Sequence, residues 1–206
     1  MTDLYLFRHG QTEWNTRKLY QGHRDSELTA QGINDILSMR NQIEGISFQT
    51  VYCSPLGRTK QTLALLSPET ERTIFDPRLM EISLGSMEGQ PFDQVPEGLE
   101  EASRNFWSDP ENFRIPGAET FREVHRRVMD FIDEISRARG PVLAVTHTIP
   151  IRIILNWVYQ KDFSRLWDEP AVSAGSLIRI KGSPPVISGI VSPAEVSASV
   201  IPEQAR

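Results

Sequence analysis

Side chains suited to acid–base and anion chemistry stand where short apolar segments of this chain end. They are Arg8, His9, Arg58, Glu81 and His147. Paired arginines present planar donors that match a tetrahedral oxyanion, and the phosphoryl group is the commonest such anion in biology. A neutral imidazole can attack phosphorus, and a carboxylic acid whose pKa is raised by burial can protonate the departing alkoxide. These residue types predict phosphoryl transfer.

The composition offers no metal site for this chemistry. Cations can neutralise the phosphoryl oxygens by themselves. Cys53 is the single cysteine, and the four histidines, at positions 9, 23, 125 and 147, include no close-spaced pair. Cys53 lies in an apolar run, where a thiol behaves as a small hydrophobe, so we expect no redox role. We expect neither a metal nor a cofactor.

The charge and the N-terminus indicate the kind of partner and the compartment. The net charge of −5 and the pI near 5.5 argue against affinity for nucleic acid or for an anionic membrane. The start Met-Thr-Asp lacks the basic region of a signal peptide, and no window approaches ~18 uninterrupted apolar residues. We expect a soluble cytoplasmic protein that binds a small phosphorylated metabolite.

The elements that must position these side chains alternate along the sequence. Strands are predicted at 4–7, 48–53, 72–75, 141–146 and 176–180, and helices at 29–43, 59–66, 99–107, 119–135 and 151–159. This alternation predicts an α/β fold, a three-layer α/β/α sandwich around a mostly parallel sheet. Ligands of such sheets bind beyond the carboxyl ends of the strands, and the candidate side chains fall at those ends.

The remaining segments complete the predicted organisation. Residues 1–182 form a single catalytic domain, within which 84–116, rich in Gly, Pro, Glu and Asp, is a lid-like excursion. The strand at 176–180 is predicted to lie at the sheet edge, where a homodimer could form. Residues 183–206 lack periodicity and are predicted to be an irregular tail.

Four sequence blocks resemble one known family. They are RHGQTEWN at 8–15, SPLGRTKQT at 54–62, RLMEISLGSMEG at 78–89 and THTIPIR at 146–152. In order and spacing they resemble the histidine phosphatase superfamily, the phosphoglycerate-mutase-like proteins. The segments QGHRDSELTAQG at 21–32 and PGAETFREVHRRV at 116–128 are also similar to family segments. The resemblance covers most of the chain except the tail and implies a phosphoglycerate-mutase-like fold.

The resemblance implies catalytic roles that agree with the chemistry above. His9 would be the nucleophile that becomes phosphorylated, and Glu81 would donate the proton to the leaving group and then help to activate water. The phosphoryl oxygens would be held by Arg8, Arg58 and His147. The family needs no metal.

Further positions match the family's substrate pocket. Asn15 would add a phosphate hydrogen bond, and Gln21 with Gly22 would line the pocket. Because His9 must keep one ring nitrogen free to attack, we expect a backbone carbonyl to hold its other N–H. Glu88 lies in the same block as Glu81 and is the alternative acid.

Thr148 departs from the family, which usually has glycine after the second histidine. If the family uses this position through its backbone N–H, threonine can donate equally well, and it could also cap a helix ahead of Pro150. If glycine is needed for room or for positive φ, threonine would crowd the pocket or strain the backbone. We expect retained activity, with Thr148 altering the substrate fit.

Other charged residues receive structural interpretations. His23 and His125 are expected to have no direct role. Arg122, Arg126 and Arg127 are expected to form a solvated helix face, and Arg152 a structural ion pair.

Three functions are compatible with these residues. A phosphatase of small phosphomonoesters is favoured, because the interval from Glu81 to His147 is short, whereas glycolytic mutases tend to carry a larger insertion there. A mutase and a phosphate-binding regulatory module with little turnover are the alternatives. Specificity would come from the excursion and from the loop at 17–24, whose basic residues could meet a second anionic group.

Overall fold

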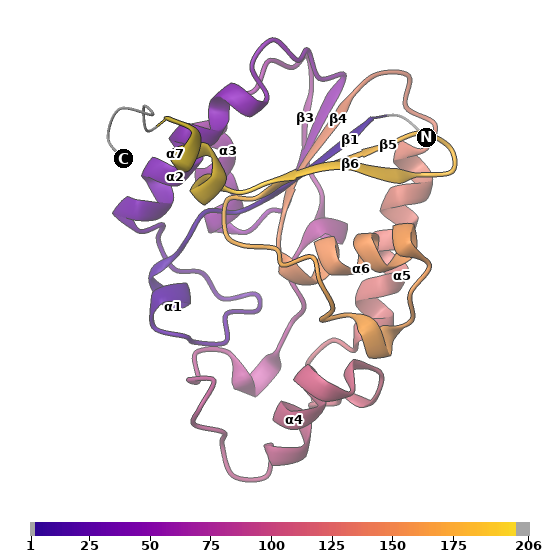
Figure 1. Cartoon of the computed structure of the whole chain (residues 1–206). Coiled ribbons are helices and arrows are strands. Elements are labelled where there is room, and N and C mark those ends of the chain that lie inside the picture. Colours follow the sequence, from indigo (N-terminus) through magenta and orange to yellow (C-terminus); the bar gives the residue numbers. More distant parts are fainter. Residues whose placement is uncertain (1–2, 201–206) are drawn as a thin grey trace.

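A six-stranded sheet in the order β3-β2-β4-β1-β5-β6 forms the centre of the computed structural model, which describes residues 3–200 (Figure 1). The strands β1, β2, β3 and β4 are parallel, whereas β5 is antiparallel to β1 and β6 is antiparallel to β5. Their bounds are β1 Leu4–Arg8, β2 Thr50–Cys53, β3 Thr73–Phe75, β4 Val142–Thr146, β5 Leu177–Lys181 and β6 Val186–Val191.

Helices cover both faces of this sheet, as the sequence predicts. Figure 1 shows α2, α3 and α7 on one face and α5 and α6 on the other. Alternate residues of β1 explain the two layers: Leu4 and Leu6 pack among α5 and α6, whereas Tyr5 and Phe7 pack among α2 and α3. The helix bounds are α1 Glu13–Thr16, α2 Ala30–Met39, α3 Gly57–Leu66, α4 Glu100–Ser108, α5 Phe121–Ile135, α6 Thr148–Tyr159 and α7 Pro193–Val200. Short 3₁₀ turns occupy Arg40–Gln42, Pro77–Leu79, Gly85–Met87, Pro110–Asn112 and Phe163–Arg165.

The strand β1 is fixed more firmly than any edge strand can be. It pairs with β4 on one side and β5 on the other, and both of its faces are buried. Pairing on both sides holds the carboxyl end of β1 rigidly, and this fixes the positions of Arg8 and His9.

Two expectations about the C-terminal part are wrong: that the strand at 176–180 lies at the sheet edge, and that the chain from residue 183 is irregular. The strand β5 is interior, because β6 pairs with it and forms the actual edge, and α7 follows β6 and packs against α2. The segment of β6, VISGIV, alternates only weakly and is half exposed; it is ordered by backbone pairing with β5 and by the partly buried Ile187 and Ile190, which pack against the core. Residues 201–206 of the predicted tail lie outside the described residues.

The excursion at 84–116 folds over the carboxyl ends of the parallel strands. It contains α4, whose Phe106 is buried against Phe113 and Phe121. Figure 1 shows α4 and α1 at the same end of the molecule, below the sheet in this view. No helix in the described part of the chain is long and apolar enough to cross a membrane.

Candidate active site

A cavity of about 470 Å³ lies at the carboxyl end of the sheet, under the excursion. Arg8 from the end of β1, His9 directly after it, and Glu81 after the turn Pro77–Leu79 line this cavity. Arg58 and His147 are almost fully buried and lie behind the lining. The structure therefore brings the predicted groups together at one rim. A larger cavity, of about 740 Å³, lies elsewhere and contains none of them.

His9 is oriented by its own neighbour. Its Nδ1 lies 2.8 Å from the carbonyl oxygen of Gly10, so Nδ1 carries the hydrogen and Nε2 keeps a free lone pair. This confirms the expected backbone carbonyl. Burial, with further contributions from Arg58 and Arg8, holds the pKa of His9 well below its usual range. The imidazole is therefore neutral near pH 7 and able to act as a nucleophile.

Gly10 is required for close packing. A Cβ atom at this position would lie 2.4 Å from Cδ1 of Ile36 in α2. The glycine lets the chain that carries His9 pass directly against this helix.

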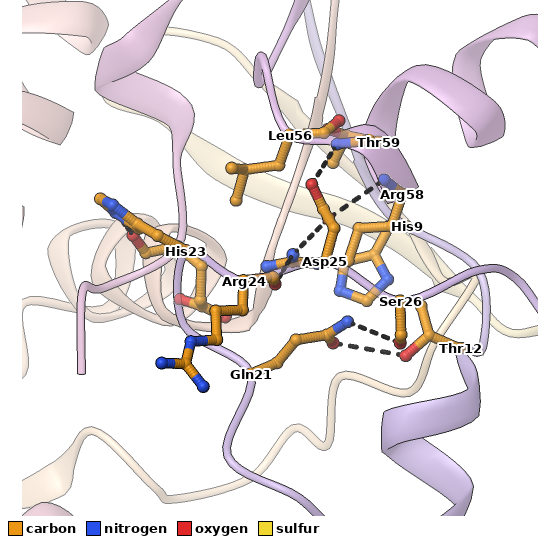
Figure 2. A network of polar contacts seen from close by, with 12 residues as sticks. His9, Thr12, Gln21, His23, Arg24, Asp25, Ser26, Leu56, Arg58 and Thr59 are labelled. Atoms are coloured by element: carbon orange, nitrogen blue, oxygen red, sulfur yellow. Dashed lines mark hydrogen bonds and ion pairs between the residues drawn. The ribbon is translucent and has the colours of Figure 1, made fainter. Parts of the chain in front are cut away.

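Arg58 is held by the loop that follows α1. Its Nη1 donates to Oδ1 of Asp25 at 2.8 Å and to the carbonyl oxygen of Arg24 at 2.9 Å, and its Nη2 donates to the carbonyl oxygen of Gly22 at 2.8 Å. Figure 2 shows Asp25 between the loop and Arg58, close to His9. The side chain is 1% exposed. The guanidinium is thus fixed on one side by the protein.

Arg8 and Arg58 share one property that bears on ligand binding. The Nη1 of Arg8 donates to the carbonyl oxygen of Val172, but the Nε atoms of both arginines are buried and lack a partner within residues 3–200. Burial lowers the pKa of Arg8 to about 10, which still leaves it charged at pH 7. A buried donor left unpaired costs about 1–3 kcal/mol, and an acceptor bound beside these N–H groups would remove that cost.

His147 lies next to His9, with 5.1 Å between the ring centroids. Its Nε2 is 2.7 Å from the hydroxyl oxygen of Ser54, and its buried Nδ1 has no partner within the described residues. Burial, reinforced by Arg58 and His9, keeps the pKa of His147 well below its usual range. When the Ser54 hydroxyl donates to Nε2, the ring hydrogen resides on Nδ1, which is then a further donor.

The carboxyl group of Glu81 sits at the N-terminus of α6. Its Oε1 accepts from the N–H groups of Ile82 at 3.0 Å and Ile149 at 3.2 Å, and its Oε2 accepts from the N–H of Thr148 at 3.2 Å. Burial raises the pKa of Glu81, although the Ile82 N–H, Arg58 and Arg8 oppose the shift. A carboxyl group with a raised pKa beside the cavity can serve as a proton donor.

The alternative acid, Glu88, has a structural role. Its Oε1 accepts from the N–H groups of His23 at 2.9 Å and Leu84 at 3.0 Å, so it joins the loop after α1 to the excursion. Glu88 does not line the cavity, whereas Glu81 does.

The main chain of Glu81 is held by two residues for which no such contact was expected. Nη2 of Arg127 donates to the Glu81 carbonyl oxygen at 3.0 Å, and Nε2 of His23 lies 2.8 Å from the same oxygen. Arg127 also pairs with Glu119 at 2.9 Å, so its predicted place on a solvated helix face is wrong. The sequence pattern could not show this, because Arg127 lies at the edge of the buried face of α5, beside Val128 and Val124.

Thr148 is the first residue of α6, and His147 occupies the N-cap position. The expectation that Thr148 caps the helix is therefore wrong. Thr148 donates its backbone N–H to Glu81, as threonine and glycine can do equally, and it is not among the residues with positive φ. Its side chain lines the cavity, so an effect on the substrate fit stays a prediction.

The predicted pocket residues Asn15, Gln21 and Gly22 also line the cavity. Oδ1 of Asn15 accepts from the Thr12 N–H at 3.1 Å, which leaves its NH₂ group as the donor. Gln21 is held by Thr12 and Ser26, as Figure 2 shows. Gly22 has φ of 55°, and a Cβ there would meet Glu88 at 2.2 Å, so glycine is needed for both conformation and space.

The sequence predicts a structural ion pair for Arg152, and it does not indicate the aromatic part of the cavity lining. Arg152 lines the cavity and donates to the carbonyl oxygens of Leu166 and Asp168, so its partners are main-chain groups and not the predicted ion pair. Five aromatic side chains also line the cavity. They are Tyr20, Phe92, Phe106, Trp107 and Trp167. Their positions have no helical or strand period that could have pointed to one site.

Within residues 3–200, no cluster of His, Cys, Asp and Glu could hold a metal ion. The thiol of Cys53 is buried, and burial raises its pKa to about 12.

The fold and the site combine a mostly parallel sheet with an Arg-His at a strand end and a second buried histidine beside it. The model of the histidine phosphatase superfamily (branch 1) matches residues 4–185, and the chain belongs to this family.

Relatives of known name include both mutases and phosphatases. A probable phosphoglycerate mutase GpmB of Salmonella choleraesuis is 32% identical over 162 residues, which are 77% of this chain and 75% of that protein. Phosphoserine phosphatase 1 of Hydrogenobacter thermophilus is 29% identical over 170 residues, 81% of each chain. The solved structure of Bacillus stearothermophilus YhfR superposes with a TM-score of 0.82 at 29% identity, covering 88% of this chain and 91% of that one. These likenesses show a phosphatase or mutase family and its phosphoglycerate-mutase-like fold.

Proposed function

We propose that the protein hydrolyses phosphomonoesters of small metabolites through a phosphohistidine on Nε2 of His9, without a metal. One observation carries the proposal. A neutral His9, oriented by Gly10, lines the cavity beside Arg8, and the buried Nε donors of Arg8 and Arg58 have no partner in the described chain.

In the first step, Nε2 of His9 attacks phosphorus, and the bond from phosphorus to the ester oxygen breaks. The guanidinium groups of Arg8 and Arg58 and the Nδ1–H of His147 neutralise the phosphoryl oxygens. Asn15 adds its NH₂ group as a further donor. The protonated Glu81 gives its proton to the departing oxygen, and the alcohol leaves.

In the second step, the Glu81 carboxylate takes a proton from water while the water oxygen attacks phosphorus. The bond from phosphorus to Nε2 breaks, inorganic phosphate leaves, and Glu81 is protonated again. Every group returns to its starting state, so the cycle needs no external acid, base or metal.

The shape of the cavity favours hydrolysis over mutase activity. The loop at 17–24 contributes only Leu19, Tyr20, Gln21 and Gly22 to the lining. Arg24 turns toward Glu88, with its Nη1 donating to the Glu88 carbonyl oxygen at 3.0 Å, and Figure 2 shows it pointing away from His9. The expectation that basic residues of this loop meet a second anionic group therefore lacks support. Retaining an anionic phosphoglycerate for a second transfer would call for further cations, and beyond Arg8 the described lining offers only Arg152, whose Nη1 already donates to two carbonyl oxygens.

The test is phosphate release from a panel of phosphomonoesters and bisphosphates in the presence of EDTA. We expect release by the wild type, loss of at least about a thousandfold in His9→Ala, and acid-labile label from ³²P substrate on the wild type alone. His125→Ala is the matched control, since this exposed histidine lies outside the cavity. Isomerised phosphoglycerate without net release would identify a mutase, and binding of phosphate without turnover would identify a regulatory module.

A further inference from the structure

Part of the cavity lining is a continuous aromatic surface, which we call the aromatic wall. It consists of Tyr20, Phe92, Phe106, Trp107 and Trp167. The ring centroids of Tyr20 and Phe92 are 4.6 Å apart, and those of Trp107 and Trp167 are 4.8 Å apart. Phe106 contacts Tyr20, Trp107 and Trp167, so the rings form one packed group.

The polar atoms of the aromatic wall are already used within the protein. Nε1 of Trp107 donates to the Tyr20 hydroxyl at 3.0 Å, and Nε1 of Trp167 donates to the Phe106 carbonyl oxygen at 2.9 Å. The wall therefore presents ring carbon to the cavity. The two indole rings are held in place because each donates a hydrogen bond through its nitrogen.

Two members of the wall are exposed to an unusual degree for large aromatic residues. Phe92 is 40% exposed and Trp107 is 44% exposed, and both line the cavity. Exposed aromatic rings grouped at a cavity mark a place where an apolar ligand group is buried. The excursion at 84–116 supplies Phe92, Phe106 and Trp107, so this segment makes most of the wall.

The remaining lining residues make one end of the cavity polar and leave the other apolar, so they would orient a ligand. Arg8, His9 and Glu81 form the anion-binding end, while Leu19, Ile82 and Leu84 continue the apolar side. Arg152 is the one further cation in the lining, and its guanidinium stacks over the Trp167 ring with 5.1 Å to the centroid. The Nε of Arg152 is buried without a partner in the described chain, but apart from this one group the wall presents carbon, against which a flat ring would lie on matching rings.

We propose that the aromatic wall is the leaving-group subsite, and that the preferred substrates are phosphomonoesters whose alcohol carries a flat aromatic ring on a short linker. This inference rests on the proposed phosphatase function and adds the class of substrate to it. The larger cavity is not a rival site, because its arginine and lysine are engaged by acidic partners, Arg122 by Glu111 and Lys161 by Asp168.

The experiment compares esters whose alcohols are similarly basic, so that chemistry does not bias the result. We expect kcat/KM for 2-phenylethyl phosphate to exceed that for ethyl phosphate by about tenfold or more, mainly through KM. In Phe92→Ala this ratio should fall at least about fivefold. Phe75→Ala is the matched control, because Phe75 is an exposed phenylalanine on β3 that does not line the cavity. It should leave the ratio unchanged.

Three results would overturn the inference. They are equal kcat/KM for the two esters, a ratio that does not respond to Phe92→Ala, and equal use of 2-cyclohexylethyl phosphate, which would show that flatness is irrelevant.

A binding measurement separates this inference from the proposed function. The non-hydrolysable 2-phenylethylphosphonate should bind wild-type protein about tenfold more tightly than ethylphosphonate, measured by calorimetry and by quenching of tryptophan fluorescence. If neither ester is hydrolysed but the two phosphonates still differ, the subsite stands and the phosphatase function fails. If both esters are hydrolysed and the phosphonates bind equally, the function stands and the subsite fails.

Discussion

Oδ1 of Asp25 lies 2.8 Å from Nη1 of Arg58, and the same carboxylate accepts the N–H groups of Gly57 and Arg58 at the start of α3. One side chain therefore caps the helix and orients the guanidinium that the helix carries. The N-cap residue itself, Leu56, makes no side-chain cap. Because Asp25 comes from the loop after α1, this loop sets the position of Arg58 before any substrate arrives.

Replacing Asp25 should therefore affect stability and catalysis together. We expect Asp25→Ala to lower the free energy of unfolding by about 2–3 kcal/mol, since it leaves the buried Arg58 without its ion-pair partner, and to lower kcat/KM about a hundredfold. Asp25→Asn keeps an acceptor but loses the charge, so its stability and its kcat/KM should lie between those of the wild type and Asp25→Ala. Denaturant titration and steady-state kinetics measure these effects. Asp35→Asn, on the exposed face of α2, is the control. Wild-type kinetics in Asp25→Ala would show that Arg58 needs no positioning.

The proton of Glu81 should matter for the transfer to His9 only when the leaving group needs it. Because kcat/KM reports this first transfer and not the hydrolysis of the phosphohistidine, we expect Glu81→Gln to reduce kcat/KM for alkyl phosphates by about 10²–10⁴-fold and to reduce kcat/KM for p-nitrophenyl phosphate far less, because nitrophenolate leaves without protonation. Equal losses on both substrates would contradict the role of proton donor.

The same groups determine the sign of the pH dependence. His9 must be neutral, and burial lowers its pKa, so the nucleophile persists well below pH 6.5. Glu81 must be protonated, and burial raises its pKa above 4.5, so activity on alkyl esters should decline as pH rises through that raised value. A pH profile of kcat/KM should therefore have its maximum on the acid side, and the p-nitrophenyl ester should lose the alkaline decline. An alkaline optimum with alkyl esters would exclude Glu81 as the acid.

His23 should act on the reaction through Glu81. Its ring donates to the Glu81 carbonyl oxygen, and the pKa of His23 is raised chiefly by Glu119, 3.6 Å away. We expect His23→Phe to lower kcat/KM for alkyl phosphates about fivefold, with a smaller effect on kcat/KM for p-nitrophenyl phosphate. His23→Gln, which retains a donor, should recover part of the loss. His125→Phe is the control, and a uniform loss on both esters would indicate a merely structural role.

Thr148→Gly tests the departure from the family pattern. The backbone N–H that Thr148 donates to Glu81 is kept by glycine, so kcat should change little, about twofold or less. The side chain lines the cavity, so KM and substrate preference should change more. Thr148→Ser keeps most of the volume and should resemble the wild type. An equal fall in kcat and kcat/KM in the glycine variant would contradict a steric effect.

The parts of the fold that sequence predicts well are those whose pattern is local. The strands β1 and β4 are continuous apolar runs, and α5 combines a buried stripe with a capping box formed by Thr120 and Glu123. The Arg-His at a strand end predicts the place of the candidate site by a topological rule that needs no coordinates.

The features that sequence missed depend on partners far along the chain. The order of β6 comes from β5, and the burial of Arg127 depends on carbonyl groups near residue 80. Arg152 reaches carbonyl groups 14 and 16 residues away, and the aromatic wall joins three separate segments. The pattern of charge and hydrophobicity along the sequence cannot reveal such long-range contacts.

The position of β1 in the sheet has a consequence for how the protein comes into being. Both neighbours of β1 are made from residues 142–181, so the ribosome must synthesise most of the chain before the segment that carries His9 has a strand on either side. A nascent chain that ends after β3 already contains Arg8, His9 and Arg58, but it lacks both strands that flank β1. The candidate site therefore cannot assemble until β4 and β5 have been synthesised, late in biosynthesis.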